Sequence, residues 1–199
     1  MDYSFESLPA DLQEIFEYFY PEDTPLRRLL LKHSFQVAEK ALDIAGKLPE
    51  NFVDKSVVFK GALLHDIGVG MCHAPRILCT GQLNYICHGC AGSSMLRKYG
   101  AEKGADLEVY ALICERHTGS GITAAEVRQQ ALPLEIRDYL PLSREEKLIA
   151  LADKFFSKSG NMAEKPLSRI RTSMAEFGAA SLERFDALCD LFGVDHAEN

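Results

Sequence analysis

The sequence predicts an all-α fold, a bundle of about eight helices with additional packing helices at the C-terminal end. Apolar residues recur with the helical period along almost the whole chain, and no stretch alternates as a half-buried strand does. With 199 residues, 47% of them hydrophobic, the chain is long enough for one core and short for two. We therefore expect a single domain over residues 1–199, with its core at about residues 25–160.

Caps and breakers set the boundaries of the predicted helices. A threonine or serine followed three residues later by glutamate opens two of them, because that pair satisfies free backbone N–H groups. Residues 70–82, which contain Pro75 and Gly81, predict a loop over one end of the bundle. The helices are expected at 12–19, at 25–46 after Thr24, from Asn51 or Asp54 to Gly68 or Gly70, at 88–99 and 105–117 with glycine stops at 100 and 119, after Thr123–Glu126 and Ser143–Glu146, from Pro166, and at 180–192.

Charge and composition exclude several classes of protein. Twenty-nine acidic against 22 basic residues give a formal charge of -7, which argues against a nucleic-acid polymer or an anionic membrane as partner. No apolar run approaches the ~20 residues that span a bilayer, and residues 1–9 carry no secretion pattern, so a cytoplasmic protein is expected. The six cysteines do not indicate a disulfide framework, and most are expected as reduced thiols.

Histidines and aspartates at inward-facing helix positions are the most informative feature of the chain. His33 lies on the apolar stripe of Leu30 and Val37, and Asp153 on that of Ile149. A single such histidine is usually a hydrogen-bonded core residue, but burying a whole series without partners costs roughly 2 kcal/mol apiece. A metal explains the series, and the donor types favour a hydrolytic dinuclear centre over iron–sulfur or structural zinc. The candidate ligands are His33, His65, Asp66, His88, His117 and Asp153.

Four short motifs carry a resemblance to a known family. They are Leu-Leu-His65-Asp66-Ile-Gly, the upstream His33-Ser-Phe-Gln-Val, the downstream Glu-Arg-His117-Thr-Gly and the late Leu-Ala-Asp153-Lys. In this order the chain resembles the HD superfamily of metal-dependent phosphohydrolases over about residues 25–160. Within that superfamily it is similar to the dinuclear subset of bacterial symmetrical dinucleoside tetraphosphatases.

The resemblance implies a helical HD-domain bundle that holds one or two divalent ions, generally iron, with Mn, Mg, Zn or Ni as substitutes. Asp66 would bridge two ions and orient the reacting groups, while the ions lower the pKa of a shared water and stabilise charge at phosphorus. The implied ligand groups share Asp66: His33, His65, Asp66 and Asp153 in one, and Asp66, His88 and His117 in the other.

The chain departs from the family pattern at two places that bear on the substrate. Val69 follows the His-Asp pair where the family often has a phosphate-binding lysine, and the interval from His117 to Asp153 is long. Other donors must then meet the substrate phosphate, although each candidate is also compatible with a solvated surface position. The candidates are Arg76, Thr118 and Lys154, with Arg97 and Arg116 less favoured.

Cysteines around His88 leave a second metal hypothesis open. Cys87 and Cys90 have a metal or redox spacing, and with Cys72 and Cys79 they could form a four-thiolate zinc site. The intervals between the four are looser than in paired zinc knuckles, which argues against it. The remaining histidines, His73 and His196, are interpreted as surface residues.

The leading hypothesis is a hydrolase acting on a small phosphorylated metabolite, with a nucleotide or a dinucleoside polyphosphate as the preferred substrate class. A dinuclear-iron oxygenase on the same scaffold stays open, although the element His117-Thr-Gly favours hydrolysis. A noncatalytic module that binds a nucleotide as a signal is the third alternative. The exposed face of the terminal helices could pair with a second copy, so a homodimer also stays open.

Overall fold

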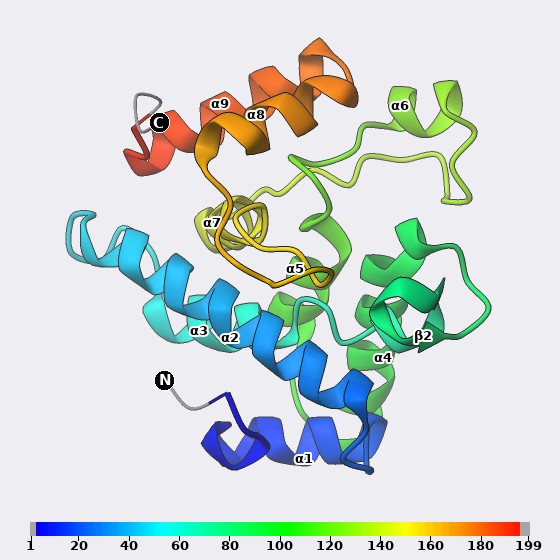
Figure 1. Ribbon diagram of the computed structural model, residues 1–199. Coiled ribbons are helices and arrows are strands. Elements are labelled where there is room, and N and C mark those ends of the chain that lie inside the picture. Colours follow the sequence, from blue (N-terminus) through cyan, green and yellow to red (C-terminus); the bar gives the residue numbers. More distant parts are fainter. Residues whose placement is uncertain (1–2, 196–199) are drawn as a thin grey trace.

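The structure, a computed structural model, describes residues 3–195. Within this range the protein has nine α-helices and one very small sheet (Figure 1), which confirms the all-α prediction. The single-domain organisation stays a prediction. The helices are α1 (Ala10–Phe19), α2 (Pro25–Gly46), α3 (Lys55–Leu64), α4 (His88–Lys103), α5 (Glu108–Arg116), α6 (Ala124–Gln129), α7 (Arg144–Asp153), α8 (Leu167–Glu176) and α9 (Ala179–Phe192).

Helix α3 lies at the centre of the bundle and packs against α2, α5 and α7. Helix α3 carries a glycine where α5 and α7 come close, because a Cβ at Gly61 would collide with the side chains of Ile113 and Ile149. Helices α4 and α5 pack as a pair, and α9 rests on α7 with α8 beside it. Figure 1 shows α1 at one end of the bundle and the α8–α9 pair at the other. The ligand-type residues of α2, α3, α5 and α7 are thereby brought to a common interior.

The predicted helix starts are confirmed where a side chain caps the first turn. The Thr24 hydroxyl accepts from the backbone N–H of Arg27, and Pro25 follows at the first helical position. Asp54, rather than Asn51, caps α3. The capping box Thr123–Glu126 forms in both directions. The second box forms only in part: the Ser143 hydroxyl caps α7, but the Glu146 carboxylate accepts from the N–H of Leu142 instead.

Several predicted helix ends are wrong, because some glycines serve packing rather than termination. Helix α4 continues through Gly100 and ends at Gly104, whose φ of 68° is the left-handed conformation that favours glycine. Helix α3 ends at Leu64, before Gly68, where a Cβ would lie 2.2 Å from the backbone nitrogen of Gly92. Gly68 therefore allows the chain after α3 to touch α4. Helix α5 begins at Glu108 and ends at Arg116, inside the predicted range 105–117.

The predicted loop over the end of the bundle contains a small hairpin. Strands β1 (His73–Ala74) and β2 (Cys79–Thr80) pair antiparallel, with short 3-10 turns before, between and after them. Two residues per strand are too few to produce an alternation in the sequence, so the hairpin was not predicted, and the all-α class is unaffected by it. Among residues 3–195, no helix combines the length and apolarity needed to cross a bilayer.

Candidate metal centre

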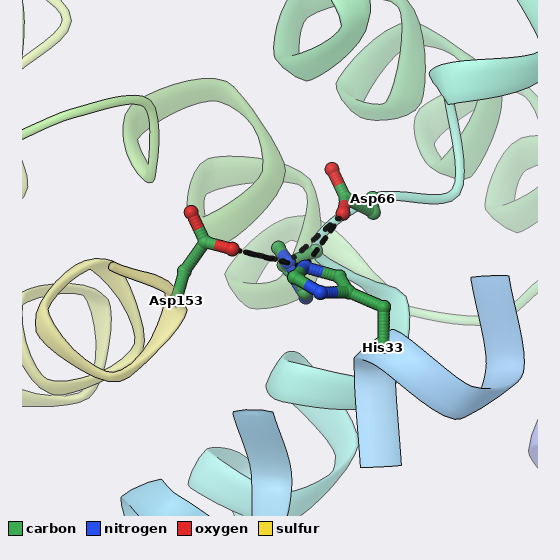
Figure 2. A group of neighbouring side chains, drawn as sticks. His33, Asp66 and Asp153 are labelled. Carbon is green, nitrogen blue, oxygen red and sulfur yellow. Dashed lines mark hydrogen bonds and ion pairs between the residues drawn. The ribbon is translucent and has the colours of Figure 1, made fainter. Parts of the chain in front are cut away.

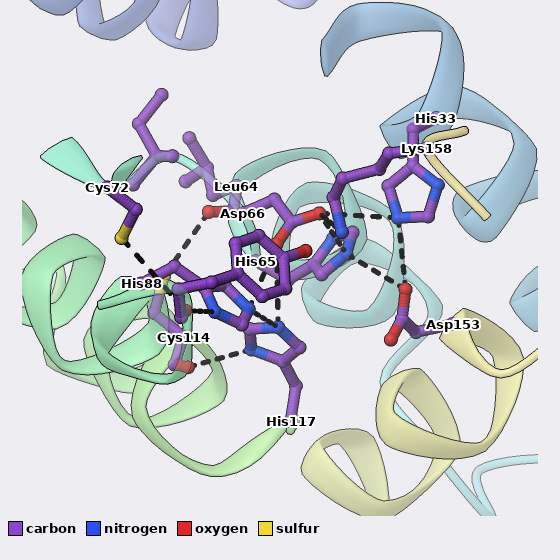
Figure 3. A network of polar contacts seen from close by, with 12 residues as sticks. His33, Leu64, His65, Asp66, Cys72, His88, Cys114, His117, Asp153 and Lys158 are labelled. Atoms are coloured by element: carbon purple, nitrogen blue, oxygen red, sulfur yellow. Dashed lines mark hydrogen bonds and ion pairs between the residues drawn. The ribbon is translucent and has the colours of Figure 1, made fainter. Parts of the chain in front are cut away.

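The six candidate ligands converge in the interior of the bundle (Figure 3). Each is at most 7% exposed to solvent. They arrive from helices that are distant in the sequence, and most lie at helix ends. Their positions are His33 within α2, His65 and Asp66 directly after α3, His88 at the start of α4, His117 directly after α5 and Asp153 at the end of α7.

Two groups of ligand atoms form at this point, and in each the atoms lie within 4.8 Å of one another. Asp66 belongs to both groups. Figure 2 shows His33 between Asp66 and Asp153, with its imidazole directed at both carboxylates. The first group contains His33, His65, Asp66 and Asp153, and the second contains Asp66, His88 and His117.

Three of the histidines are held in one tautomer by backbone carbonyls. The Nδ1–H groups of His65, His88 and His117 donate to the carbonyls of the residues three positions earlier, at 2.6, 2.7 and 2.7 Å. A carbonyl can only accept, so each Nδ1 carries the proton. For His65 and His117 these carbonyls belong to the last turn of a helix, where the intrahelical hydrogen-bond ladder stops, and for His88 the carbonyl belongs to the 3-10 turn before α4. In the neutral ring, Nε2 is then an unprotonated acceptor that faces the centre.

The Nε2 atoms of His88 and His117 lie 3.0 Å apart. Burial lowers the pKa of His88 to about 3 and also lowers that of His117, so both rings are neutral near pH 7. Two acceptor nitrogens at this distance repel each other unless a cation lies close to both. His65 differs: burial opposes its protonation, but the charges of Asp66 and Asp153 raise its pKa to about 9.

Asp66 turns one oxygen toward each group. Its Oδ2 lies 3.2 Å from His33 Nε2 and 3.1 Å from His65 Nε2. Its Oδ1 lies 3.3 Å from His88 Nε2 and 3.5 Å from His117 Nε2. Neither oxygen has a hydrogen bond of good geometry, and both are fully buried. A buried carboxylate in this condition is costly unless cations compensate it.

The second carboxylate of the centre is Asp153. Its Oδ1 lies 3.0 Å from His33 Nε2 and 3.5 Å from His65 Nε2. Burial would raise the pKa of Asp153, but Lys154 and His33 hold it well below its usual range. Burial acts on Asp66 in the same direction and is likewise outweighed, here by Lys158 and His65. Both aspartates therefore remain ionised.

Lys158 was missed by the sequence reasoning. Its Nζ lies 2.5 Å from Asp66 Oδ2, and its side chain is only 8% exposed. The residue stands in a Ser-Lys-Ser-Gly stretch after α7, which has the composition of a solvated loop. Only its short distance in sequence from Asp153 could have suggested a place near the centre.

The three predicted substrate contacts lie around the centre rather than in it. Arg76 is exposed and lines a cavity of about 260 Å³ together with Lys158. Thr118 and Lys154 are half-buried and line a larger cavity of about 450 Å³. The Nζ of Lys154 lies 2.9 Å from the outer oxygen, Oδ2, of Asp153.

Arg97 and Arg116 point elsewhere. Arg97 pairs with Glu108 and Glu115, and Arg116 pairs with Glu146. These ion pairs occupy both guanidinium groups in contacts between helices, which agrees with the lower weight given to them as substrate contacts.

The cysteine hypothesis finds no support in the geometry. All six cysteines are free thiols, as expected for most of them. Within residues 3–195, neither group of candidate metal ligands contains a cysteine. Cys87, for instance, directs its thiol to the carbonyl of Pro133. His73 is exposed, as interpreted, whereas His196 lies outside the described residues.

The family model described as HD domain matches residues 30–157, which is well over half of the chain. The chain belongs to the HD domain family. The match covers the segments that supply both groups of ligands and ends just before Lys158. Family membership and the buried His/Asp cluster together indicate divalent-metal binding.

Three relatives of this HD-domain protein are similar over somewhat less than two thirds of the chain. An uncharacterized protein of Methanocaldococcus jannaschii is 37% identical over 126 residues, which cover 62% of this chain and 64% of that one. Two proteins named tRNA (cytidine(56)-2'-O)-methyltransferase, from Picrophilus torridus and Thermoplasma volcanium, are 36% and 34% identical over 129 and 128 residues. Those stretches cover 65% and 64% of this chain but 32% of each methyltransferase. The matched part of the chain therefore spans less than two thirds of these relatives, and no solved structure matches it.

The residues present fit a pair of divalent ions. Unprotonated imidazole nitrogens and ionised carboxylates are the donors that Fe, Mn and Zn accept, and a carboxylate with one oxygen in each group can serve two ions. Asp66 Oδ1, which has no hydrogen-bond partner, and the facing nitrogens of His88 and His117 are the places where a positive charge is missing, whereas Oδ2 already contacts the Lys158 ammonium group.

Proposed function

We propose that this HD-domain protein is a metal-dependent hydrolase of phosphate ester or phosphoanhydride bonds in a small nucleotide-like substrate. A dinucleoside polyphosphate is one candidate. The observation that carries the proposal is the position of Asp66, whose two oxygens face two groups of buried imidazoles. Such a centre is suited to bonds whose cleavage develops negative charge on oxygen.

The two groups differ in what they offer a metal. In the proposed assignment His33, His65 and Asp153 hold one ion, His88 and His117 hold the other, and Asp66 serves both. We propose iron as the native metal, with Mn, Mg, Zn or Ni as substitutes, since several first-row ions accept these donors. When bound, two such ions supply an activated water and stabilise phosphoryl oxygens.

The protein's own residues perform the positioning. The carbonyls behind His65, His88 and His117 fix these rings so that Nε2 faces inward, and fixed rings cost little reorganisation on metal binding. Asp66 orients the centre from the turn after α3. Lys154 provides a positive charge between the centre and the larger cavity, where it can meet a phosphate oxygen.

The cavity of about 450 Å³ supports a nucleotide-sized substrate. Ligand pockets commonly measure about 300–1,000 Å³ and combine an apolar lining with a few polar groups. Its wall near the centre contains Thr118, Lys154 and Tyr85, whose ring stacks on His88 with centroids 4.7 Å apart. The lining also contains polar residues such as Glu126 and Arg184, and apolar residues that suit a base, which are Ile122, Leu132, Pro133, Met174 and Phe177.

A reconstitution experiment tests the proposal. Metal-free protein is loaded anaerobically with Fe(II), Mn, Mg, Zn or Ni, and phosphate release is measured from mononucleotides, dinucleoside polyphosphates and simple phosphate esters. We expect turnover with at least one metal and loss of turnover in Asp66→Asn, but not in His73→Ala, whose side chain is exposed. A fully loaded protein that cleaves none of these bonds would overturn the proposal.

The same samples separate the alternatives. A dinuclear-iron oxygenase would consume dioxygen and release no phosphate. A noncatalytic module would bind a nucleotide tightly in the presence of metal and leave it intact. Two relatives are named as tRNA methyltransferases, and this chain matches about a third of each. Methyl transfer to tRNA is therefore assayed beside hydrolysis.

A further inference from the structure

Lys158 is the one lysine of the described chain whose ammonium group contacts Asp66. In Figure 3 its side chain ends at the Asp66 carboxylate. The contact is made with Oδ2, the same oxygen that lies 3.2 Å from His33 Nε2 and 3.1 Å from His65 Nε2. Three nitrogen groups thus converge on one oxygen.

Because of this convergence, the ammonium group and an ion held by the first group of ligands would share one oxygen of Asp66. A divalent ion bound by His33, His65 and Asp66 uses the oxygen that Lys158 now contacts. Two cations around one oxygen repel each other strongly where little water screens them. Lys158 therefore competes with the ion for Asp66.

A second place for the ammonium group lies beside the first. Lys158 also lines the cavity of about 260 Å³, together with Ala74, Arg76, Ile77, Tyr85, Ser157 and Ser159. This lining holds a guanidinium, two serine hydroxyls and the lysine itself, and none of the described residues in it is acidic. Such a set of donors suits a phosphoryl group, since charge-assisted hydrogen bonds to phosphate are among the strongest.

The loop that carries Lys158 is held by hydrogen bonds on the C-terminal side of the lysine, whereas the two residues directly after the lysine are exposed. The carbonyl of Met162 accepts from the Gln36 side chain at 3.0 Å, and the N–H of Lys165 donates to the carbonyl of Phe155 at 2.8 Å. By contrast, Ser159 and Gly160 are exposed, and a Cβ added at Gly160 would meet no atom within 4 Å. The flexible four-carbon side chain of Lys158 can therefore redirect its ammonium group without any movement of the helices.

We propose that Lys158 is a positioning residue with two alternative partners: Asp66, and the phosphoryl group of the substrate in the cavity beside Arg76. The inference rests on the proposed function for the identity of the second partner. In this proposal the smaller cavity binds the phosphoryl group, and the larger cavity binds the rest of the substrate.

Binding measurements test the two partners separately. Mn²⁺ affinity is measured from the EPR signal of the free ion, and inorganic phosphate binding to the Mn-loaded protein by calorimetry. In Lys158→Met we expect Mn²⁺ to bind at least about tenfold more tightly, because the competing charge is gone. We expect phosphate to bind at least about tenfold more weakly, because a charged donor is lost.

Two further variants complete the comparison. Arg76→Gln should weaken phosphate binding without tightening Mn²⁺, because Arg76 lines the cavity but makes no ion pair in the centre. Lys55→Met removes an exposed lysine at the start of α3 and should change neither value. Lys158→Gln is measured in parallel, so that the test survives if the methionine variant does not fold.

Unchanged or weaker Mn²⁺ binding in both Lys158 variants would overturn the competition with the ion. Unchanged phosphate binding in them would overturn the second partner. Neither measurement needs turnover. If the wild-type protein binds Mn²⁺ and phosphate as expected but cleaves no ester, the proposed function fails while the two partners of Lys158 stand.

Discussion

Asp66 and Glu115 are both buried carboxylates, yet their surroundings are opposite. Glu115 has a donor on each oxygen: Arg137 at 2.8 Å on Oε1, and Arg97 at 3.2 Å with Ser93 at 3.3 Å on Oε2. Asp66 has ring nitrogens at 3.1–3.5 Å and a single lysine. Glu115 is neutralised by arginines, which are always charged, whereas the Oδ1 atom of Asp66 faces the acceptor nitrogens of His88 and His117.

This difference distinguishes a carboxylate that is buried for structural reasons, Glu115, from one that is buried for function, Asp66. A carboxylate with all its donors in place ties elements together, here α4, α5 and the segment before α7. Asp66 instead has neutral His88 and His117 facing its Oδ1, a costly arrangement that makes sense when an ion completes it. Substitutions at the two sites should therefore fail in different ways.

The largest effect is expected for Asp66→Asn, measured as Mn²⁺ affinity. The amide keeps an oxygen but loses the charge shared by both ligand groups. Affinity should fall about a thousandfold or more, since residues that only support metal ligands already change it about 10–100-fold. His73→Ala is the control. A loss below tenfold would mean that Asp66 does not bridge the two groups.

Glu115→Gln should act on stability instead, by about 3 kcal/mol, since removing one partner of a buried ion pair leaves the others uncompensated. Urea unfolding measures this value, and Mn²⁺ affinity should stay within about twofold. A large loss of Mn²⁺ affinity in a folded Glu115→Gln protein would erase the distinction between the two sites.

The stability difference between wild type and Glu115→Gln should depend on pH. Burial would raise the pKa of Glu115, but Arg137 and Arg97 hold it below its usual range. A depressed pKa stabilises the folded state above the unfolded value of about 4.3, and this contribution is lost as pH falls through the folded value. The stability difference between wild type and Glu115→Gln should therefore shrink below about pH 4. A difference that is constant down to pH 3 would contradict this assignment.

Chelation sharpens the comparison further. An ion at 100 times its dissociation constant adds about 2.7 kcal/mol to the folded state, which corresponds to roughly 5–11 °C in melting temperature for a chain of this size. EDTA should remove this increment from wild type and from Glu115→Gln. Asp66→Asn should show almost no increment to remove.

The smallest effect is expected for Thr123→Ala. Its hydroxyl caps α6 and also donates to Glu126, a carboxylate that is satisfied like Glu115, here by Arg184. Loss of such a cap costs about 1 kcal/mol, measurable by urea unfolding, with no change in Mn²⁺ affinity. Ser143→Ala, which removes the cap of α7, should behave alike. A loss above about 3 kcal/mol would give Thr123 a role beyond capping.

Local chemistry explains how much of the fold could be predicted. Thr24 with Pro25, and Thr123 with Glu126, determine helix starts through contacts within one turn, and these starts were found. Gly68 and Gly100 were misread as helix ends because their function depends on a distant backbone, at α4 and at Ala105. A two-residue strand leaves no periodic signal at all.

The same division holds for the site. Residue type and helical phase singled out the six buried histidines and aspartates, which the structure brings together, while their role as metal ligands stays a prediction. Lys158 could not be found in this way. Its burial over Asp66 follows from the path of a loop that Gln36 and Lys165 hold in place, and no local pattern encodes that path.

The most direct test of the central claim is anomalous diffraction from crystals of the Mn-loaded or Fe-loaded protein. We expect two peaks, one bonded to His88 Nε2 and His117 Nε2 and the other to His33, His65 and Asp153, with Asp66 bonded to both at about 2.0–2.3 Å. Fully loaded crystals whose peaks lie away from Asp66 would contradict the account.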